Sequence, residues 1–171
     1  MDPRRLLPTL AVLTSVALAV TLLGHLVLDR DAPGTDRQRA AVTEAPARTV
    51  LREWDAARAA AWAQGDVAAL RSLYTDGSAA GERDVAMLRR WVRRGFVVTG
   101  MRSQVLRWRV VGAGSGADSL VLEVTDRLTG AQARHRDGGR RTLPASTPRT
   151  RRITWRRVGG VWQVAASVPG R

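Results

Sequence analysis

The sequence predicts an α+β domain, in which a group of helices precedes a run of antiparallel strands. Apolar residues recur every three or four positions between residues 49 and 94, which is the period of an α-helix. From residue 96 onward they alternate at every second position, as in strands with one buried face. No helical pattern returns between the strands, so the order of elements indicates α+β and not the βαβ units of a parallel sheet.

Three helices are predicted in the first part of this domain. The first covers residues 49–64, where apolar side chains at spacings of three and four share one face. The second covers residues 67–74, and Asp66 can cap it. The third covers residues 83–94, where Asp84 is best explained as a helix cap.

Six strands are predicted in the second part. Gly159 and Gly160 separate the last two strands, which is a strong signal for a hairpin. Residues 137–148 are polar and contain several Gly and Pro residues, which predicts a loop. The strands can form one curved antiparallel sheet whose concave face the helices cover. The predicted strands are 96–101, 104–111, 119–128, 131–136, 150–158 and 161–168.

A long apolar stretch precedes the domain. Residues 8–28 contain no Asp, Glu, Lys or Arg, and as a helix they would be about 31 Å long, enough to cross a bilayer. Arg4 and Arg5 before the stretch predict that the N-terminus stays in the cytoplasm and that the rest is exported. The predicted organisation is a cytoplasmic N-terminus at 1–7, a transmembrane helix at 8–28, a flexible linker at 29–46 and an extracytoplasmic domain at 47–171.

A cleaved signal peptide is the alternative, because a positive start followed by an apolar run describes both kinds of segment. Ala17, Leu18 and Ala19 resemble a cleavage site, but they lie in the middle of the apolar run. No site with small residues follows the end of the run, so the sequence favours an uncleaved signal-anchor over a secreted domain.

The charge of the chain points to an anionic partner. The formal net charge is +13, and all 28 basic residues are Arg. Such a surface is expected to attract anionic lipids, wall polymers or an acidic protein. Arg and Trp also alternate, as in some nucleic-acid surfaces, but each Trp falls on an apolar face, and an exported domain seldom meets DNA. The predicted basic face consists of Arg89, Arg90, Arg93, Arg94, Arg107, Arg109, Arg152 and Arg156.

Two stretches resemble a known superfamily. TVLREWDAARAAAWAQGDVAALRSLYTDGS resembles the opening of NTF2-like (SnoaL-like) domains, and GGVWQVAASV resembles their usual last strand. The likeness covers residues 47–168. It implies a cone of three helices on a bent sheet, with a pocket between the layers and dimerisation through the sheet as one option. Membrane-anchored domains of this kind recur in actinobacterial envelope assemblies, and members of the superfamily include both enzymes and binding proteins, so the fold does not decide the function.

Few residues qualify for chemistry. The pocket candidates are Tyr74, Trp108 and Asp126, of which Tyr74 is expected to be half-buried with its hydroxyl at the rim and Asp126 to pair with an Arg or end a strand. No second polar group stands at a diagnostic spacing, so no catalytic residue is assigned. The chain has no Cys, and its histidines are His25, in the apolar stretch, and His135, in a predicted loop; no metal or cofactor motif occurs.

Two functions are therefore expected. The first is a membrane-anchored envelope accessory protein whose exported domain binds a partner protein or an anionic surface without catalysis. The alternative is a domain that binds a small molecule or lipid, or a cyclase- or isomerase-like enzyme. An open cone with at least two converging polar groups would favour the alternative, whereas a cone filled by Trp54, Trp108 and Trp155 would exclude it.

Overall fold

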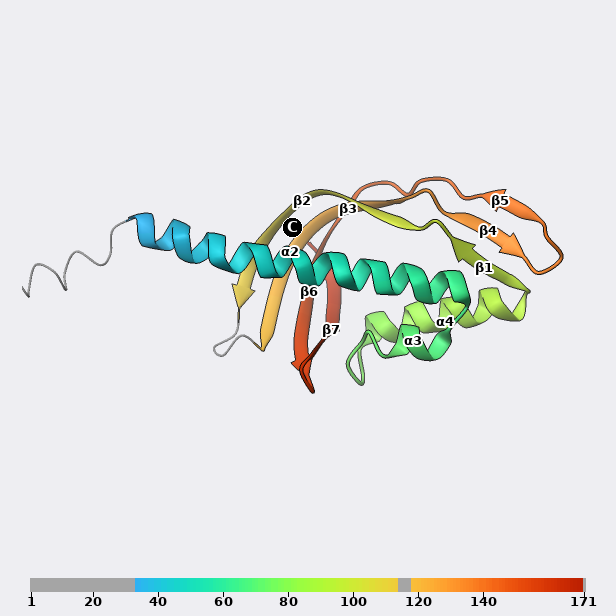
Figure 1. Cartoon of the computed structure of the whole chain (residues 1–171), viewed down its shortest axis with the longest axis horizontal. Coiled ribbons are helices and arrows are strands. Elements are labelled where there is room, and N and C mark those ends of the chain that lie inside the picture. Colours follow the sequence, from blue (N-terminus) through green and yellow to red (C-terminus); the bar gives the residue numbers. More distant parts are fainter. Residues whose placement is uncertain (1–32, 114–117, 171) are drawn as a thin grey trace, which may run out of the picture. The chain divides into compact units, whose positions relative to one another are not determined.

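The computed structural model describes residues 33–113 and 118–170. The chain divides into two compact units, Met1–Val42 and Thr43–Arg171, and the second unit holds the helix-and-sheet domain (Figure 1). The predicted transmembrane helix at 8–28 lies outside the described residues. Within the described part of the chain, no helix is both long and apolar enough to cross a membrane.

Three helices open the described structure: α2 (Pro33–Gln64), α3 (Val67–Arg71) and α4 (Ala79–Arg93). Helix α2 begins sixteen residues before the predicted start at residue 49, within the segment expected to be a linker. Pro33 suits the first helical turn, where a backbone N–H has no partner, and the following residues include the good helix formers Ala, Arg, Gln and Glu.

Helix α4 corrects the expectation for Asp84. The N-cap is Ser78, whose Oγ accepts a hydrogen bond from the N–H of Gly81, so the helix begins at Ala79 and not near residue 83. Asp84 therefore lies inside the helix, and it is buried. The apparent cap was misread because an Asp near the start of an apolar pattern is typical of helix ends.

Seven strands follow the helices in the described residues, and they form two hydrogen-bonded sheets and not the single curved sheet expected from the sequence. Strands β1, β4 and β5 form the smaller sheet, and β2, β3, β6 and β7 form the larger one, with all neighbours antiparallel. Strand β5 lies in the predicted loop, and all of its residues are exposed, so no apolar alternation marked it. The strands are β1 (Phe96–Thr99), β2 (Arg102–Ala113), β3 (Ser119–Thr129), β4 (Gln132–His135), β5 (Arg140–Thr142), β6 (Arg149–Val158) and β7 (Val161–Pro169).

Two glycines face each other where the strands change direction. Gly100 joins β1 to β2, Gly130 joins β3 to β4, and both have a φ of +69°. A Cβ atom on Gly100 would lie 2.7 Å from the carbonyl oxygen of Gly130, and one on Gly130 would lie 2.9 Å from that of Gly100. No side chain fits at either position, so this glycine pair permits the step from the smaller sheet to the larger one.

The core lies between the helices and the inner face of the larger sheet. Along β3, Leu120, Leu122, Val124 and Asp126 are buried, whereas the alternate residues face outward. Figure 1 shows the helices from Thr43 onward on the concave side of this sheet. The largest fully buried side chains are Trp155, Leu70, Leu88, Leu122, Ile153, Val124 and Val164.

The connection between α3 and α4 adds to the edge of the larger sheet. Tyr74 forms a parallel bridge with Val164 of β7. The N–H of Thr75 donates to the carbonyl of Val164 at 3.1 Å, and the N–H of Val164 donates to the carbonyl of Leu73 at 2.9 Å. Tyr74 is therefore held by its backbone against β7 while its side chain points into the domain.

Candidate functional site

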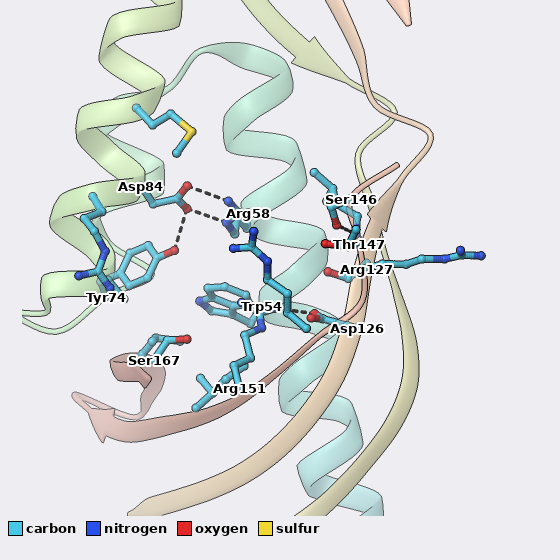
Figure 2. A pocket seen from close by; sticks show the side chains of 18 residues that line it. Trp54, Arg58, Tyr74, Asp84, Asp126, Arg127, Ser146, Thr147, Arg151 and Ser167 are labelled. Carbon is cyan, nitrogen blue, oxygen red and sulfur yellow. Dashed lines mark hydrogen bonds and ion pairs between the residues drawn. The ribbon is translucent and has the colours of Figure 1, made fainter. Parts of the chain in front are cut away.

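A cavity of about 600 Å³ lies between the helices and the inner face of the larger sheet. One wall is apolar and includes Trp54, Ile153 and Val164. On α4, the cavity is lined by Ala80, Arg83, Asp84 and Met87, whose spacings of three and four place them on one helix face. Figure 2 shows the polar side chains of the cavity converging from both the helices and the sheet.

A three-residue cluster joins the helices at one side of the cavity. Arg58 of α2 donates from Nε to Oδ2 of Asp84 at 2.6 Å and from Nη2 to Oδ1 at 2.7 Å. The hydroxyl of Tyr74 donates to the same Oδ2 at 2.8 Å. The side chain of Asp84 is only 8% exposed, so this carboxylate needs its partners in order to be buried. Figure 2 shows all three contacts as dashed lines.

The environment of this cluster changes two proton affinities. Burial raises the pKa of the Tyr74 hydroxyl, and the negative charge of Asp84 raises it further. Burial would lower the pKa of the Arg58 guanidinium, but the hydrogen bonds and charge of Asp84 outweigh burial and raise it. Tyr74 thus stays a neutral donor and Arg58 a cation at neutral pH.

A second pair lies across the cavity on the sheet. Arg151 of β6 pairs through Nη2 with Oδ2 of Asp126 on β3, and both side chains are mostly buried. The Nε atom of Arg151 is buried and has no hydrogen-bond partner within the described residues. Near this pair, Ser103 donates to Oδ1 of Asp55 at 3.1 Å, and burial raises the pKa of the Asp55 carboxyl.

The structure brings together two of the three predicted pocket residues. Tyr74 and Asp126 both line the cavity, although Tyr74 is buried with its hydroxyl bonded to Asp84 and does not stand at the rim. The partner of Asp126 is Arg151, which the sequence did not single out. Trp108 does not line the cavity, because its half-buried ring packs against the core elsewhere on the inner sheet face.

The tryptophans do not fill the cone. Trp54 lines the cavity, and its ring meets those of Tyr74 and Trp155 edge-on, at centroid distances of 5.9 Å and 6.4 Å. Trp155 is fully buried in the core below. The condition that would have excluded a ligand site is therefore not met.

Sequence reasoning missed Arg58, Asp84 and Arg151. Arg58 and Trp54 lie four residues apart on one helix face, and Arg151 alternates with Ile153 and Trp155 on the buried face of β6. An Arg on an otherwise apolar face was the available signal, because a guanidinium is buried only with a partner. The partners themselves are far apart in sequence, and only the fold shows them.

The predicted basic face is divided between two elements. Arg89, Arg90, Arg93 and Arg94 lie on or directly after α4, and all four are exposed. The other four arginines lie on β2 and β6 and face outward, away from the helices, so the eight do not form one surface. On that outer face, Glu123 lies 2.8 Å from Arg109 and 3.9 Å from Arg152.

Other predicted features fall outside the cavity. His135, which was expected in a loop, is the last residue of β4. It packs its ring against Phe96 at a centroid distance of 4.6 Å and lies 3.1 Å from the carboxylate of Asp137. Within residues 33–113 and 118–170, no three His, Cys, Asp or Glu side chains gather as they would around a metal ion.

Comparisons with known proteins add evidence on the fold. No protein-family model matches the sequence, and no curated protein sequence matches it. The structure is similar to the intermembrane space region of the chloroplast protein ARC6, with 11% identity, coverage of 72% of this chain and 93% of that chain, and a TM-score of 0.52. It is also similar to Aln2 from a Streptomyces species, with 14% identity, coverage of 74% and 91%, and a TM-score of 0.50.

An NTF2-like protein of unknown function from Pseudomonas putida gives 19% identity, coverage of 74% and 84%, and a lower TM-score of 0.41. The identities of 11% and 14% to the first two structures show the fold alone. The prediction of an α+β domain with three helices on an antiparallel sheet, the arrangement expected of an NTF2-like domain, is confirmed. The membrane anchor and the actinobacterial origin stay predictions.

Proposed function

We propose that this domain binds a small organic molecule in the cavity between its helices and sheet, and that it does so without catalysing a reaction. The observation that carries the proposal is the cavity itself. Its volume of about 600 Å³ falls in the range of ligand sites, which are concave and mostly apolar with a few converging polar groups. Trp54, Ile153 and Val164 supply the apolar wall, and the two arginine–aspartate pairs supply the polar groups.

The hydrogen bonds of the cavity favour binding over catalysis. A general base must be free to accept a proton from the substrate. The carboxylate of Asp84 already accepts three hydrogen bonds, two from Arg58 and one from Tyr74. The raised pKa of Tyr74 keeps its hydroxyl protonated, so it donates and does not take up a proton. These groups therefore hold the helices in place around a binding site.

The predicted location gives this binding a context. If residues 8–28 anchor the chain, the cavity would face the outside of the cell membrane, and the protein would serve as a ligand-binding accessory of the envelope. This part of the proposal rests on the sequence of the apolar stretch and on Arg4 and Arg5 before it. Binding of a partner protein or an anionic surface remains a separate proposal, which concerns the exposed arginines of α4.

A pair of substitutions on one helix tests the proposal. Ala80 lines the cavity and Ala79 is exposed beside it, so Ala80→Phe should fill the cavity and Ala79→Phe should not. The probe is 2-naphthamide, a neutral aromatic molecule, titrated against the intact chain in lipid nanodiscs by ligand-observed NMR, with empty nanodiscs as the blank. We expect saturable binding to the wild type and to Ala79→Phe, and none to Ala80→Phe.

Ser167→Phe fills the same cavity from β7 and provides a second blocked variant if Ala80→Phe folds poorly. Cooperative thermal unfolding of each variant, followed by circular dichroism, is the folding control. Equal binding to the wild type and to both filled variants would contradict the proposed site.

A further inference from the structure

The charges of the cavity are unbalanced. Arg58 pairs with Asp84 and Arg151 pairs with Asp126, so these four side chains form two neutral pairs. Arg83 and Arg149 also line the cavity, and no acid lining it is left to pair with them. Within the described residues, neither of these two side chains takes part in a hydrogen bond or an ion pair. The site therefore carries two positive charges beyond those its own carboxylates balance.

Arg127 does not add to this excess. It belongs to the cavity wall, but Figure 2 shows its side chain extending away from the other polar groups. Its Nε donates to Oε1 of Gln104 at 2.7 Å on the outer side of the sheet. Asp55, whose carboxyl lies near Arg151, does not line the cavity and accepts a hydrogen bond from Ser103, so it is not one of the carboxylates that face the cavity.

The two free cations come from opposite walls. Arg83 lies on the same face of α4 as Asp84 and Met87. Arg149 of β6 lies directly opposite Asp126 of β3, so it shares the inner face of the sheet with Arg151 two residues later. The unpartnered Nε of Arg151 lies on the same wall. Guanidinium groups of a helix and of a sheet thus line the same cavity, which also has an apolar wall.

We infer that the ligand is an organic anion with an apolar, ring-sized body, and that Arg83 and Arg149 bind its acid group while Trp54, Ile153 and Val164 contact its body. This inference rests on the proposed function, because it names the class of ligand for the same cavity. A carboxylate or sulfonate matches the planar fork of a guanidinium and forms charge-assisted hydrogen bonds with it. A neutral ligand would leave both cations without a counter-charge.

The test compares two molecules that share one ring system. The anion 2-naphthoate and the neutral 2-naphthamide are titrated separately against the intact chain in nanodiscs, with empty nanodiscs and Ala80→Phe as blanks. We expect the dissociation constant of 2-naphthoate to be about tenfold lower than that of 2-naphthamide, as partly exposed charge-assisted hydrogen bonds give. Raising the salt concentration should weaken binding of the anion and leave the neutral probe unchanged.

A double variant locates the effect. Arg83→Gln with Arg149→Gln should remove the preference for 2-naphthoate and leave the affinity for 2-naphthamide unchanged. Arg89→Gln with Arg93→Gln is the matched control, because it removes the same charge at two positions of α4, the helix of Arg83, that do not line the cavity. All four arginines are exposed, so both variants should fold.

Three results would overturn the inference, and they are distinguishable. Equal affinities for the two probes, both blocked by Ala80→Phe, would reject the anionic ligand and leave the proposed cavity function standing. Equal losses of 2-naphthoate binding in both double variants would assign the preference to the overall charge and not to this site. Binding of neither probe, or binding that Ala80→Phe does not block, would reject the proposed function and this inference together.

Discussion

Asp84 is the residue on which the helical side of the cavity depends. Its carboxylate joins Arg58 of α2 to Tyr74 in the connection between α3 and α4, while Asp84 itself lies in α4. Replacing a buried ion pair as a whole can be neutral, but removing one partner leaves an uncompensated charge and costs several kcal/mol, about 3–5. The cluster therefore serves mainly to position α2, α4 and the connection that carries Tyr74, and contributes little net stability.

The substitution Asp55→Asn tests how the ionisation of one buried carboxyl affects the stability of the fold. Because burial raises the pKa of Asp55 above its ordinary value of 3.8, the folded state binds this proton more tightly than the unfolded chain does. The stability that Asp55 contributes is thus complete below pH 3.8 and is lost as the pH rises through the raised value. We expect Asp55→Asn to be more stable than the wild type at pH 7, with an advantage that shrinks toward pH 4.

Urea unfolding between pH 4 and pH 7 measures this difference. The amide oxygen introduced by the substitution can still accept the hydrogen bond of Ser103, so packing and hydrogen bonding change little. Asp76→Asn, at an exposed position, is the control for the same chemical change. A gain in stability that does not vary with pH would show that ionisation of Asp55 is not its cause.

The site residues that sequence reasoning found have local signals. Tyr74 is a polar side chain at the end of a predicted apolar helix face, and Asp126 is a polar side chain in an apolar strand. Both line the cavity. Trp108 has the same kind of signal and does not line it, because an aromatic residue on a buried face is equally suited to the core. The pairing of Arg58 with Asp84 spans 26 residues, and no local pattern encodes which of many arginines meets which carboxylate.

At the scale of elements, the pair of facing glycines controls how the strands pass from one sheet to the other. Gly100→Ala should be strongly destabilising, because it combines a φ of +69° with a Cβ only 2.7 Å from a backbone oxygen that cannot move aside. Gly77→Ala is the matched control, with a φ of +73° and no atom within 4 Å of the added Cβ.

We expect Gly77→Ala to lower the free energy of unfolding by about 1 kcal/mol, the cost of the left-handed conformation alone. Gly100→Ala should lower it by about 3 kcal/mol, since the steric conflict adds to that cost. Chemical denaturation of both variants measures the difference. Similar losses would indicate that the strands can shift apart at this step without penalty.

The elements were predictable where burial imposes a period. The six expected strands and the hairpin at Gly159 and Gly160 are present because each strand has one buried face. Strand β5 could not be predicted because it is wholly exposed, and the start of α2 could not be predicted because Pro33 and Pro46 are residues typical of a linker. Proline breaks helices on average, but the first turn tolerates it, and local propensity alone does not show when an interior one is accepted.

At the scale of the whole molecule, the net charge of +13 is distributed unevenly. On the outer face of the sheet, Glu123 forms ion pairs with two arginines, Arg109 and Arg152. The four arginines at α4 form no ion pair within the described residues. Helix α4 is therefore the stronger candidate for contact with an anionic membrane surface. The sequence predicted this role for all eight arginines of the basic face.

Vesicles of phosphatidylglycerol test this proposal with the fragment 43–171, which is one compact unit. We expect binding at low salt and release at about 1 M salt, where the Debye length falls to about 3 Å. Replacing Arg89, Arg90, Arg93 and Arg94 by Gln should abolish most of the binding, and replacing Arg107, Arg109, Arg152 and Arg156 should weaken it less. Equal effects of the two sets, or binding to neutral vesicles at all salt concentrations, would count against a role for α4.

The short bridge between Tyr74 and Val164 has a consequence for how the protein behaves in a crowded cell. Strand β7 is an edge strand of its sheet, and an uncovered edge strand offers unpaired N–H and C=O groups to any extended chain that approaches. Residues 73–75 occupy this position at Val164, and Gln163 adds a hydrogen bond to the carbonyl of Ser72. The segment that carries Tyr74 to the cavity thus also covers part of the β7 edge, so a substitution that displaces this segment should both disturb the cavity wall and expose backbone groups that can pair with another chain.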